Sequence, residues 1–163
     1  FLLKNIKFPV KAMMDKMSGV GVIQFMIDEN GDTYNHDIVD GTYEIFGEEL
    51  IRLSKLMPLK PDGKGQVFEW TVPFEQSGYD KASILNELQS KLDRFMKKER
   101  YRKALPILEN MIRIDPYQLD YLYSLARTYI ALNKIDDACK VNFRLEQLGM
   151  LPLKEITCNV DKN

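Results

Sequence analysis

The feature that most constrains the fold is a repeat in the second half of the chain, where similar residues recur 34 positions apart. The pairs are Leu88 with Leu122, Phe95 with Tyr129, Tyr101 with Ile135, and Ala104 with Ala138. Apolar residues between these positions follow a period of about 3.6, which indicates amphipathic helices. A fixed interval that holds two helices and a turn predicts stacked helical hairpins. We expect helices at about 81–97, 100–113, 118–132 and 135–148.

The finer pattern resembles the tetratricopeptide repeat family, whose hairpins have a period of about 34 residues. An aromatic residue closes the first helix of each hairpin, an alanine lies at the helix crossing, and Asp115-Pro116 ends the first repeat. Lys91, Asn142 and Met150 depart from the family, which usually has a leucine, an aromatic residue and a proline there. An alternative interpretation is a bundle of four amphipathic helices without repeat ancestry.

Either arrangement leaves apolar surface to be covered, because stacked hairpins usually need three or more units to bury their faces. We expect the first half of the chain, the tail at 151–163 or a partner to cover it. In a repeat stack the first helix of each hairpin lines a concave face. This predicts a partner-binding groove, with a buried or solvated face as the alternative. The groove residues are Asn86, Gln89, Asp93, Asp120, Tyr123 and Arg127.

The first half has the period of strands, interrupted by two short helical segments. Strands are expected at 20–27 and 33–39, joined through Asn30-Gly31, the strongest short hairpin signal. In the second of them Tyr34, His36 and Ile38 are expected to share a face. We expect one helix to begin at Pro9, and the apolar residues between 46 and 57 predict another. The order helix, strand, strand, helix, strand predicts an α+β unit with a largely antiparallel sheet.

The last strand, at 67–74, is expected at an edge of this sheet. Its sequence VFEWTVPF alternates apolar and mixed residues, and Pro73 has no backbone N–H to donate to a neighbour. Phe68 and Trp70 are expected to be core residues beneath the helices. Any function of this strand is therefore expected to reside in its backbone. An open edge is an aggregation hazard that proteins otherwise avoid, so an edge that is kept open suggests a use in binding.

The first half also resembles the TonB C-terminal domain family, over residues 5–75. An aromatic-Pro-x-x-Ala opening matches FPVKA at 8–12, and a glycine-rich strand matches GVGVIQF at 19–25. An acidic turn closed by Gly31 follows. Met-Pro, Lys-Pro, Gly-Lys and a strand ending in Pro-Phe then come in the family's order between 57 and 74.

The second helix departs from the family at its start, and Gly47 within it predicts a cost of about 1 kcal/mol against alanine.

The TonB resemblance implies a periplasmic protein that binds the extended N-terminal segment of an outer-membrane receptor. The segment adds as a strand to the domain's open edge, so that main-chain hydrogen bonds supply affinity. Here the implied partner-binding residues are Gln66, Val67, Phe68, Glu69, Trp70, Thr71 and Val72. Because the chain begins with Phe1, we expect a fragment whose membrane contact, if any, is made by an anchor upstream.

Composition argues against some classes of partner but does not decide whether the two cysteines are free or bridged. A net charge of −1 and a pI of about 5.9 give no reason to expect nucleic acid or an anionic membrane surface. The two cysteines have no metal-ligand spacing. We expect Cys139 to be a buried free thiol, because it lies within an apolar helical pattern. A bridge to Cys158 requires the tail to fold back.

The sequence contains no constellation for catalysis. His36 is the only histidine, and its strand position predicts a satisfied or half-exposed side chain rather than a catalytic base. Lys97-Lys98-Glu99-Arg100 is interpreted as a solvated turn between helices. We therefore predict a non-enzymatic protein without metal, cofactor or small-molecule substrate.

Two functional hypotheses follow for a chain divided into a TonB-like domain at 1–76, two repeats at 80–150 and a tail. In the first, an energy transducer of TonB-dependent transport binds an extended receptor segment by strand addition. In the second, the repeats form a periplasmic scaffold or adaptor, and the TonB-like domain is only structural.

Overall fold

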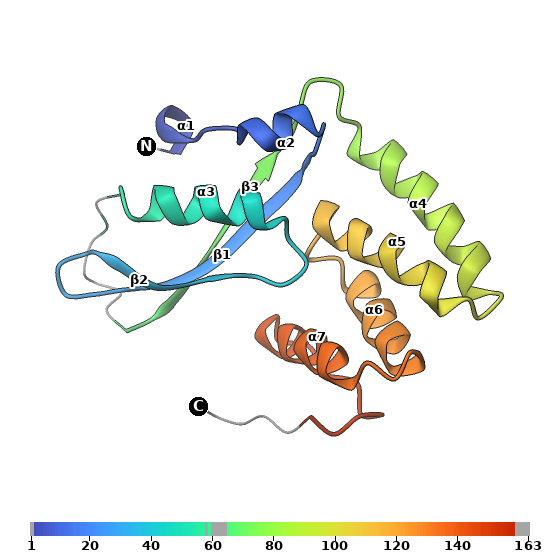
Figure 1. Cartoon of the computed structure of the whole chain (residues 1–163). Helices are drawn as coiled ribbons and strands as arrows, with labels where there is room; N and C mark the ends of the chain where they lie inside the picture. The colour runs from blue at the N-terminus through green and yellow to red at the C-terminus, as the bar shows by residue number, and fades with distance from the viewer. Residues whose placement is uncertain (1, 58, 60–64, 159–163) are drawn as a thin grey trace. The chain divides into compact units, whose positions relative to one another are not determined.

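The computed structural model describes residues 2–57, 59 and 65–158 of the chain. It contains two compact units, Phe1–Tyr79 and Asp80–Asn163 (Figure 1). The first combines a three-stranded antiparallel sheet with helices, and the second is helical, so the predicted α+β class is confirmed. None of the helices in the described ranges is long and apolar enough to cross a bilayer.

The α+β unit follows the predicted order of elements, with one further short helix at its start. Its sheet has the strand order β2-β1-β3, so β1 is central and β2 and β3 are the outer strands of the described sheet. The elements are α1 (Leu2–Asn5), α2 (Val10–Met14), β1 (Gly19–Ile27), β2 (Thr33–Ile38), α3 (Glu44–Ser54) and β3 (Val67–Phe74).

The core of this unit lies between α3 and one face of the sheet. Alternate residues of β1 (Ile23, Phe25 and Ile27) are buried together with Phe46 and Leu50 of α3. The period of two in β1 and the helical period in α3 therefore place both apolar faces against each other. Burial of such side chains stabilises a fold by about 1.5–3 kcal/mol each.

Gly47 lies in the middle of α3, where its missing side chain allows the helix to approach β2. A Cβ added at Gly47 would lie 2.6 Å from Ile38 Cγ2 and within 2.8 Å of two further atoms of that side chain. The intrinsic cost of a helical glycine is therefore offset by close packing of α3 on Ile38.

The prediction that Tyr34 shares one face with His36 and Ile38 is wrong, although His36 and Ile38 both lie on the α3 side. Ile38 pairs with Ile23 on the α3 side, whereas Tyr34 pairs with Met26 on the opposite side. The register shifts between these pairs, and Asn35 has φ 49°, in the left-handed region. One extra residue in a bulge exchanges the faces of the residues that precede it.

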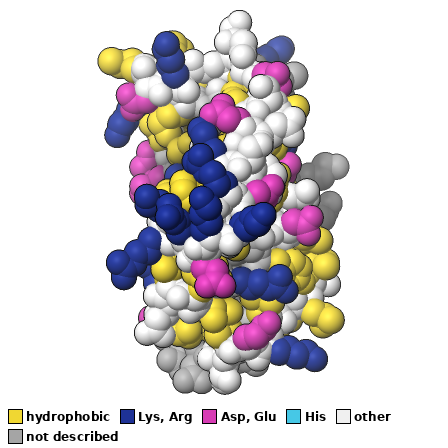
Figure 2. All heavy atoms as spheres, turned by 90° about the vertical axis from the view of Figure 1, so that its right-hand side faces the viewer, with side chains coloured by type: hydrophobic (Ala, Val, Ile, Leu, Met, Phe, Trp, Pro, Cys, Tyr) yellow, Lys and Arg dark blue, Asp and Glu magenta, His cyan; other side chains and the backbone are white. Residues whose placement is uncertain are grey.

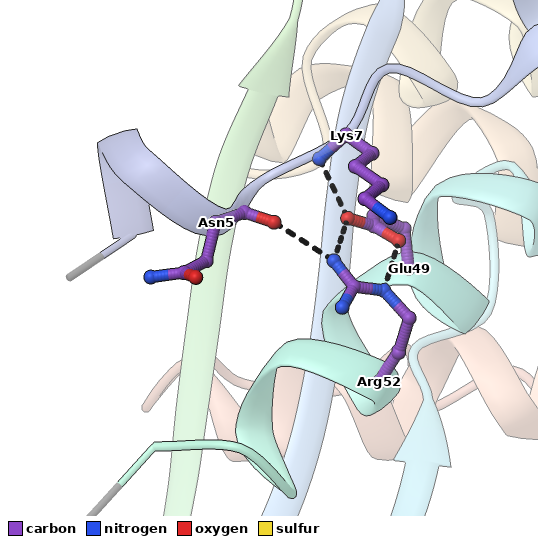
Figure 3. A network of polar contacts seen from close by, with 4 residues as sticks. All are labelled: Asn5, Lys7, Glu49 and Arg52. Carbon is purple, nitrogen blue, oxygen red and sulfur yellow. Dashed lines mark hydrogen bonds and ion pairs between the residues drawn. The ribbon is translucent and has the colours of Figure 1, made fainter.

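A polar network ties the N-terminal segment to α3 (Figure 3). Glu49 accepts hydrogen bonds from the Lys7 backbone N–H (2.7 Å) and from Arg52 Nε (2.7 Å), and Arg52 Nη2 also donates to the Asn5 carbonyl (2.8 Å). Burial alone raises the pKa of Glu49, whose side chain is only 10% exposed. The hydrogen bonds from Arg52 and Lys7 outweigh burial, so the pKa lies below its ordinary value.

The helical unit contains the four predicted helices, each ending within one residue of its expected position. Leu108, Met111 and Leu145 are fully buried in its core. The two alanines at the predicted helix crossings, Ala104 and Ala138, are 0% exposed. The helices are α4 (Lys81–Met96), α5 (Tyr101–Ile114), α6 (Leu119–Ala131) and α7 (Ile135–Gln147).

Candidate functional site

β3 is an outer strand with an unbroken register, as the sequence predicts. Eight consecutive residues pair antiparallel with β1, from Gly19 opposite Phe74 to Met26 opposite Val67. No further strand pairs with β3 in the part of the sheet that the structure describes. β3 therefore has one side that faces β1 and one side that ends the sheet.

The alternation of the ladder shows which backbone groups lie on that outer side. The Val39 N–H donates to the Val22 carbonyl (3.0 Å), so the backbone polar groups of Val22 face β2. Polar groups of successive strand residues point to opposite sides. Those of Ile23 therefore face β3, where Trp70 is its partner.

It follows that the backbone groups of Trp70 and of alternate residues along β3 point to β1. The groups of Val67, Glu69 and Thr71 point to the outer side. Pro73 has the same parity as these three, so its missing N–H falls on the outer side and costs no bond to β1. Backbone groups directed away from β1 thus recur at every second residue along β3.

The side chains of β3 separate into a core face and an exposed face. Phe68, Trp70 and Val72 are half-buried against the core, and the Trp70 ring meets Phe25 edge-on at 4.9 Å. Phe68 and Trp70 therefore pack against the core as expected, but they are partly rather than fully buried. On the other face Val67 is 64% exposed, and Glu69 accepts a hydrogen bond from Gln24 (2.8 Å). Gln66 is exposed and precedes the strand.

β2, the other outer strand, is less regular. It has six residues, a bulge at Asn35 and polar residues along most of its length. Bulges and charged residues are features that discourage pairing at a sheet edge. β3 lacks a bulge, and for this reason it is the better template for an added strand.

The six predicted groove residues lie on α4 and α6 but are not joined to each other across the two helices. Gln89 donates to Asp93 within α4 (2.7 Å). Among the described residues, no hydrogen bond or ion pair connects Asn86, Gln89 or Asp93 with the three residues of α6. The two helices are joined instead by a hydrogen bond from Thr128 Oγ1 to Met96 Sδ (4.0 Å). Asp120 and Arg127 are exposed.

Tyr123, the aromatic residue of the predicted groove, binds the chain's own tail. Its hydroxyl donates to the Leu151 carbonyl (2.7 Å). On α7, the Asn142 side chain exchanges two hydrogen bonds with the backbone of Leu153, at 3.0 and 3.1 Å. The amide of Asn142 thus acts as a strand-like partner for the extended tail.

The prediction that Cys139 is a free thiol is wrong, because Cys139 and Cys158 form a disulfide. Leu108, 34 positions before Asn142, is buried in the core. Asn142 is buried at the same repeat position by the tail, which therefore covers α7. Asn142 stands where the repeat pattern usually has an aromatic residue, and that departure was the available signal for tail docking.

His36 has a structural environment. Its Nε2 lies 2.9 Å from both Thr33 Oγ1 and Ser54 Oγ, and its ring stacks on Phe25. Burial, with a smaller effect of Lys55, lowers its pKa. No carboxylate hydrogen-bonds to His36 among the described residues, so the side chain joins β2 to α3.

Comparison with known families gives a match in the helical unit. Residues 95–145 match the tetratricopeptide repeat family. This agrees with the predicted repeat, and no match to the TonB C-terminal domain family is found. No curated protein and no solved structure matches the chain.

Proposed function

We propose that this chain is a non-enzymatic protein-interaction module that binds an extended partner segment by strand addition to β3. The tetratricopeptide match supports the general role, because repeats of that family bind proteins or peptides. The regular outer side of β3, with the backbone groups of Val67, Glu69 and Thr71 directed away from β1, supports the specific site. Strand addition derives affinity from such groups and selectivity from side-chain pockets.

The resemblance of residues 5–75 to TonB C-terminal domains supports the choice of partner. In this proposal the partner is the extended N-terminal segment of an outer-membrane receptor or transport component, and the protein acts in the periplasm. The observed order of elements and the outer position of β3 agree with that resemblance.

A second candidate function is a repeat scaffold, in which the helical unit holds the partner and the α+β unit is only structural. The family match at 95–145 favours it, and so does the way in which α6 and α7 already hold an extended segment. The tail shows that these helices can bind backbone through Tyr123 and Asn142. In this candidate a partner contacts the remaining exposed groove, around Arg127.

An NMR titration of the full chain with extended peptides from the N-termini of TonB-dependent receptors tests the two candidates. Strand addition predicts micromolar affinity and amide shifts at 67–72. Val67→Pro removes an outward N–H at the first residue of β3, where proline is tolerated. We expect about fivefold weaker binding from the lost hydrogen bond.

Val67→Ala is the matched control, because it keeps the N–H and removes only an exposed side chain. Equal binding of the proline and alanine variants, or shifts confined to α6, contradicts strand addition. Shifts around Tyr123 and Arg127 support the scaffold instead.

A further inference from the structure

The turn between α4 and α5, together with the first turn of α5, carries five basic side chains and one acidic side chain, Glu99. Lys97, Lys98, Arg100, Arg102 and Lys103 are all exposed. Across the described ranges, none of them forms an ion pair. By contrast, Lys81 pairs with Asp115, Lys91 with Glu87 and Lys134 with Asp137. We name these five residues the basic surface; the chain as a whole has a net charge of −1.

Two of these charges are placed where they oppose helix stability. Arg102 and Lys103 lie in the first turn of α5, which contains no acidic residue, and the N-cap Arg100 makes no side-chain capping bond. The N-terminus of a helix has a partial positive charge, so cations there are unfavourable. The equivalent positions of α7 are Asp136 and Asp137, the favourable sign. A local cost without compensation within the protein indicates a role in binding.

The basic surface borders a hollow of about 430 Å³. Its lining combines three basic residues and one acidic residue, Glu99, with two half-buried residues, Tyr101 and Leu132. The turn lies on the right of Figure 1. Figure 2 views that side and shows Lys and Arg side chains gathered around a few hydrophobic atoms. Positive charge and an apolar floor therefore occur together.

We propose that the basic surface binds an acidic peptide segment that inserts an apolar side chain into this hollow. Arg100 and Arg102 can each hold a carboxylate through two parallel hydrogen bonds. A membrane surface fits less well, because Tyr101 and Leu132 are recessed rather than exposed. Its residues belong to the helical unit and none of them is part of β3, so this second interaction surface does not depend on strand addition.

The test is a fluorescence-anisotropy titration of the full chain with a labelled peptide of three glutamates, one phenylalanine and three glutamates. We expect binding that weakens as salt is raised. Arg102→Glu with Lys103→Glu should weaken it by about tenfold or more, because two attractive charges become repulsive. This variant should not melt at a lower temperature than the natural chain, since it corrects the charge at the start of α5.

Lys140→Glu with Lys154→Glu is the matched control, with the same change in net charge at two exposed lysines elsewhere. It should retain binding within about twofold, because screened charges at a distance act weakly. Equal losses in both variants, or full binding by the first, would overturn the proposal. Binding to phosphatidylglycerol vesicles without binding to the peptide would overturn it in favour of a membrane. The NMR shifts of β3 report separately on strand addition.

Discussion

The two turns that join the helices of each hairpin have the same backbone, but the helices that follow them begin with opposite charges. Glu99 and Asn133, 34 positions apart, have φ 52° and 57°. The backbone N–H of the following residue donates to the backbone carbonyl of the aromatic residue in the preceding helix. These bonds run from Arg100 to Phe95 and from Lys134 to Tyr129, both at 2.9 Å. These are the bonds of a helix that ends in a left-handed residue. The repeat is therefore present in the hydrogen bonds as well as in the sequence.

The side chains that follow these turns differ in sign. Arg102 and Lys103 of α5 correspond to Asp136 and Asp137 of α7. The next residue in each helix, Ala104 or Ala138, is buried, so packing requires the same residue in both hairpins. The exposed positions before it tolerate either charge. The comparison indicates that residues alike in both hairpins are required by the fold, whereas exposed residues that differ between them are determined by what each hairpin contacts.

The hairpins also differ in what covers them. The first packs through α5 on α6, within the core of the helical unit. The second ends at a tail held by the Cys139–Cys158 disulfide and by Asn142. Stacked repeats need a terminal cap. The tail provides it, which explains how two hairpins can bury their apolar faces.

The largest predicted effect is loss of this cap. Cys139→Ala with Cys158→Ala should lower the free energy of unfolding of the helical unit by about 3 kcal/mol, as expected for a loop of this size. Guanidinium unfolding and amide exchange of the full chain measure it, with faster exchange in α7 than in α4. Unchanged exchange in α7 would show that the disulfide does not hold the tail.

Next in size are the two helix crossings. Ala104→Leu and Ala138→Leu should each cost about 1–3 kcal/mol, because both sites are fully buried and overpacking forces the helices apart. Thermal unfolding followed by circular dichroism compares them, with Lys140→Leu at an exposed site as the control. A large loss of stability for only one of the two variants would show that the helix crossings of the two hairpins are not equivalent.

Exchanging the charges between the first turns of α5 and α7 should have smaller effects on stability, of opposite sign in the two helices. Arg102→Glu with Lys103→Glu should stabilise α5, and Asp136→Lys with Asp137→Lys should destabilise α7, each by about 1 kcal/mol. Chemical unfolding at low and high salt is the measurement, since screening should reduce both effects. Destabilisation by both exchanges would contradict a helix-dipole origin.

The smallest effect concerns the left-handed residues themselves. Glu99→Asn gives the first turn the residue of the second and should stabilise it by about 0.5 kcal/mol, because asparagine tolerates this conformation better. Asn133→Glu is the reverse test. Equal stability of the natural chain and both variants would show that side-chain identity at the left-handed residue is unimportant.

The helices and strands were predictable where a pattern is local. The interval of 34 predicted α4 to α7 because buried residues of a helical hairpin recur with its geometry. Pro73 predicted the outer position of β3 because a proline cannot donate to a second neighbour. Both signals can be read from the sequence alone, the first from a fixed interval and the second from a single residue.

The rest depended on single residues or distant contacts. The bulge at Asn35 changes the face of Tyr34 through one backbone angle, which no periodicity reveals. The Cys139–Cys158 bridge depends on the path of the tail. From the sequence, Lys97-Lys98-Glu99-Arg100 is interpreted only as a solvated turn, because the lack of ion pairs around it is visible only in three dimensions.

Amide hydrogen exchange of the full chain, with and without a receptor-derived extended peptide, tests strand addition most directly. The outward amides of Val67, Glu69 and Thr71 should exchange more slowly when the peptide is bound. Those of Phe68, Trp70 and Val72 should be protected in both states, because they already face β1. A bound peptide that leaves the three outward amides unchanged would contradict the account.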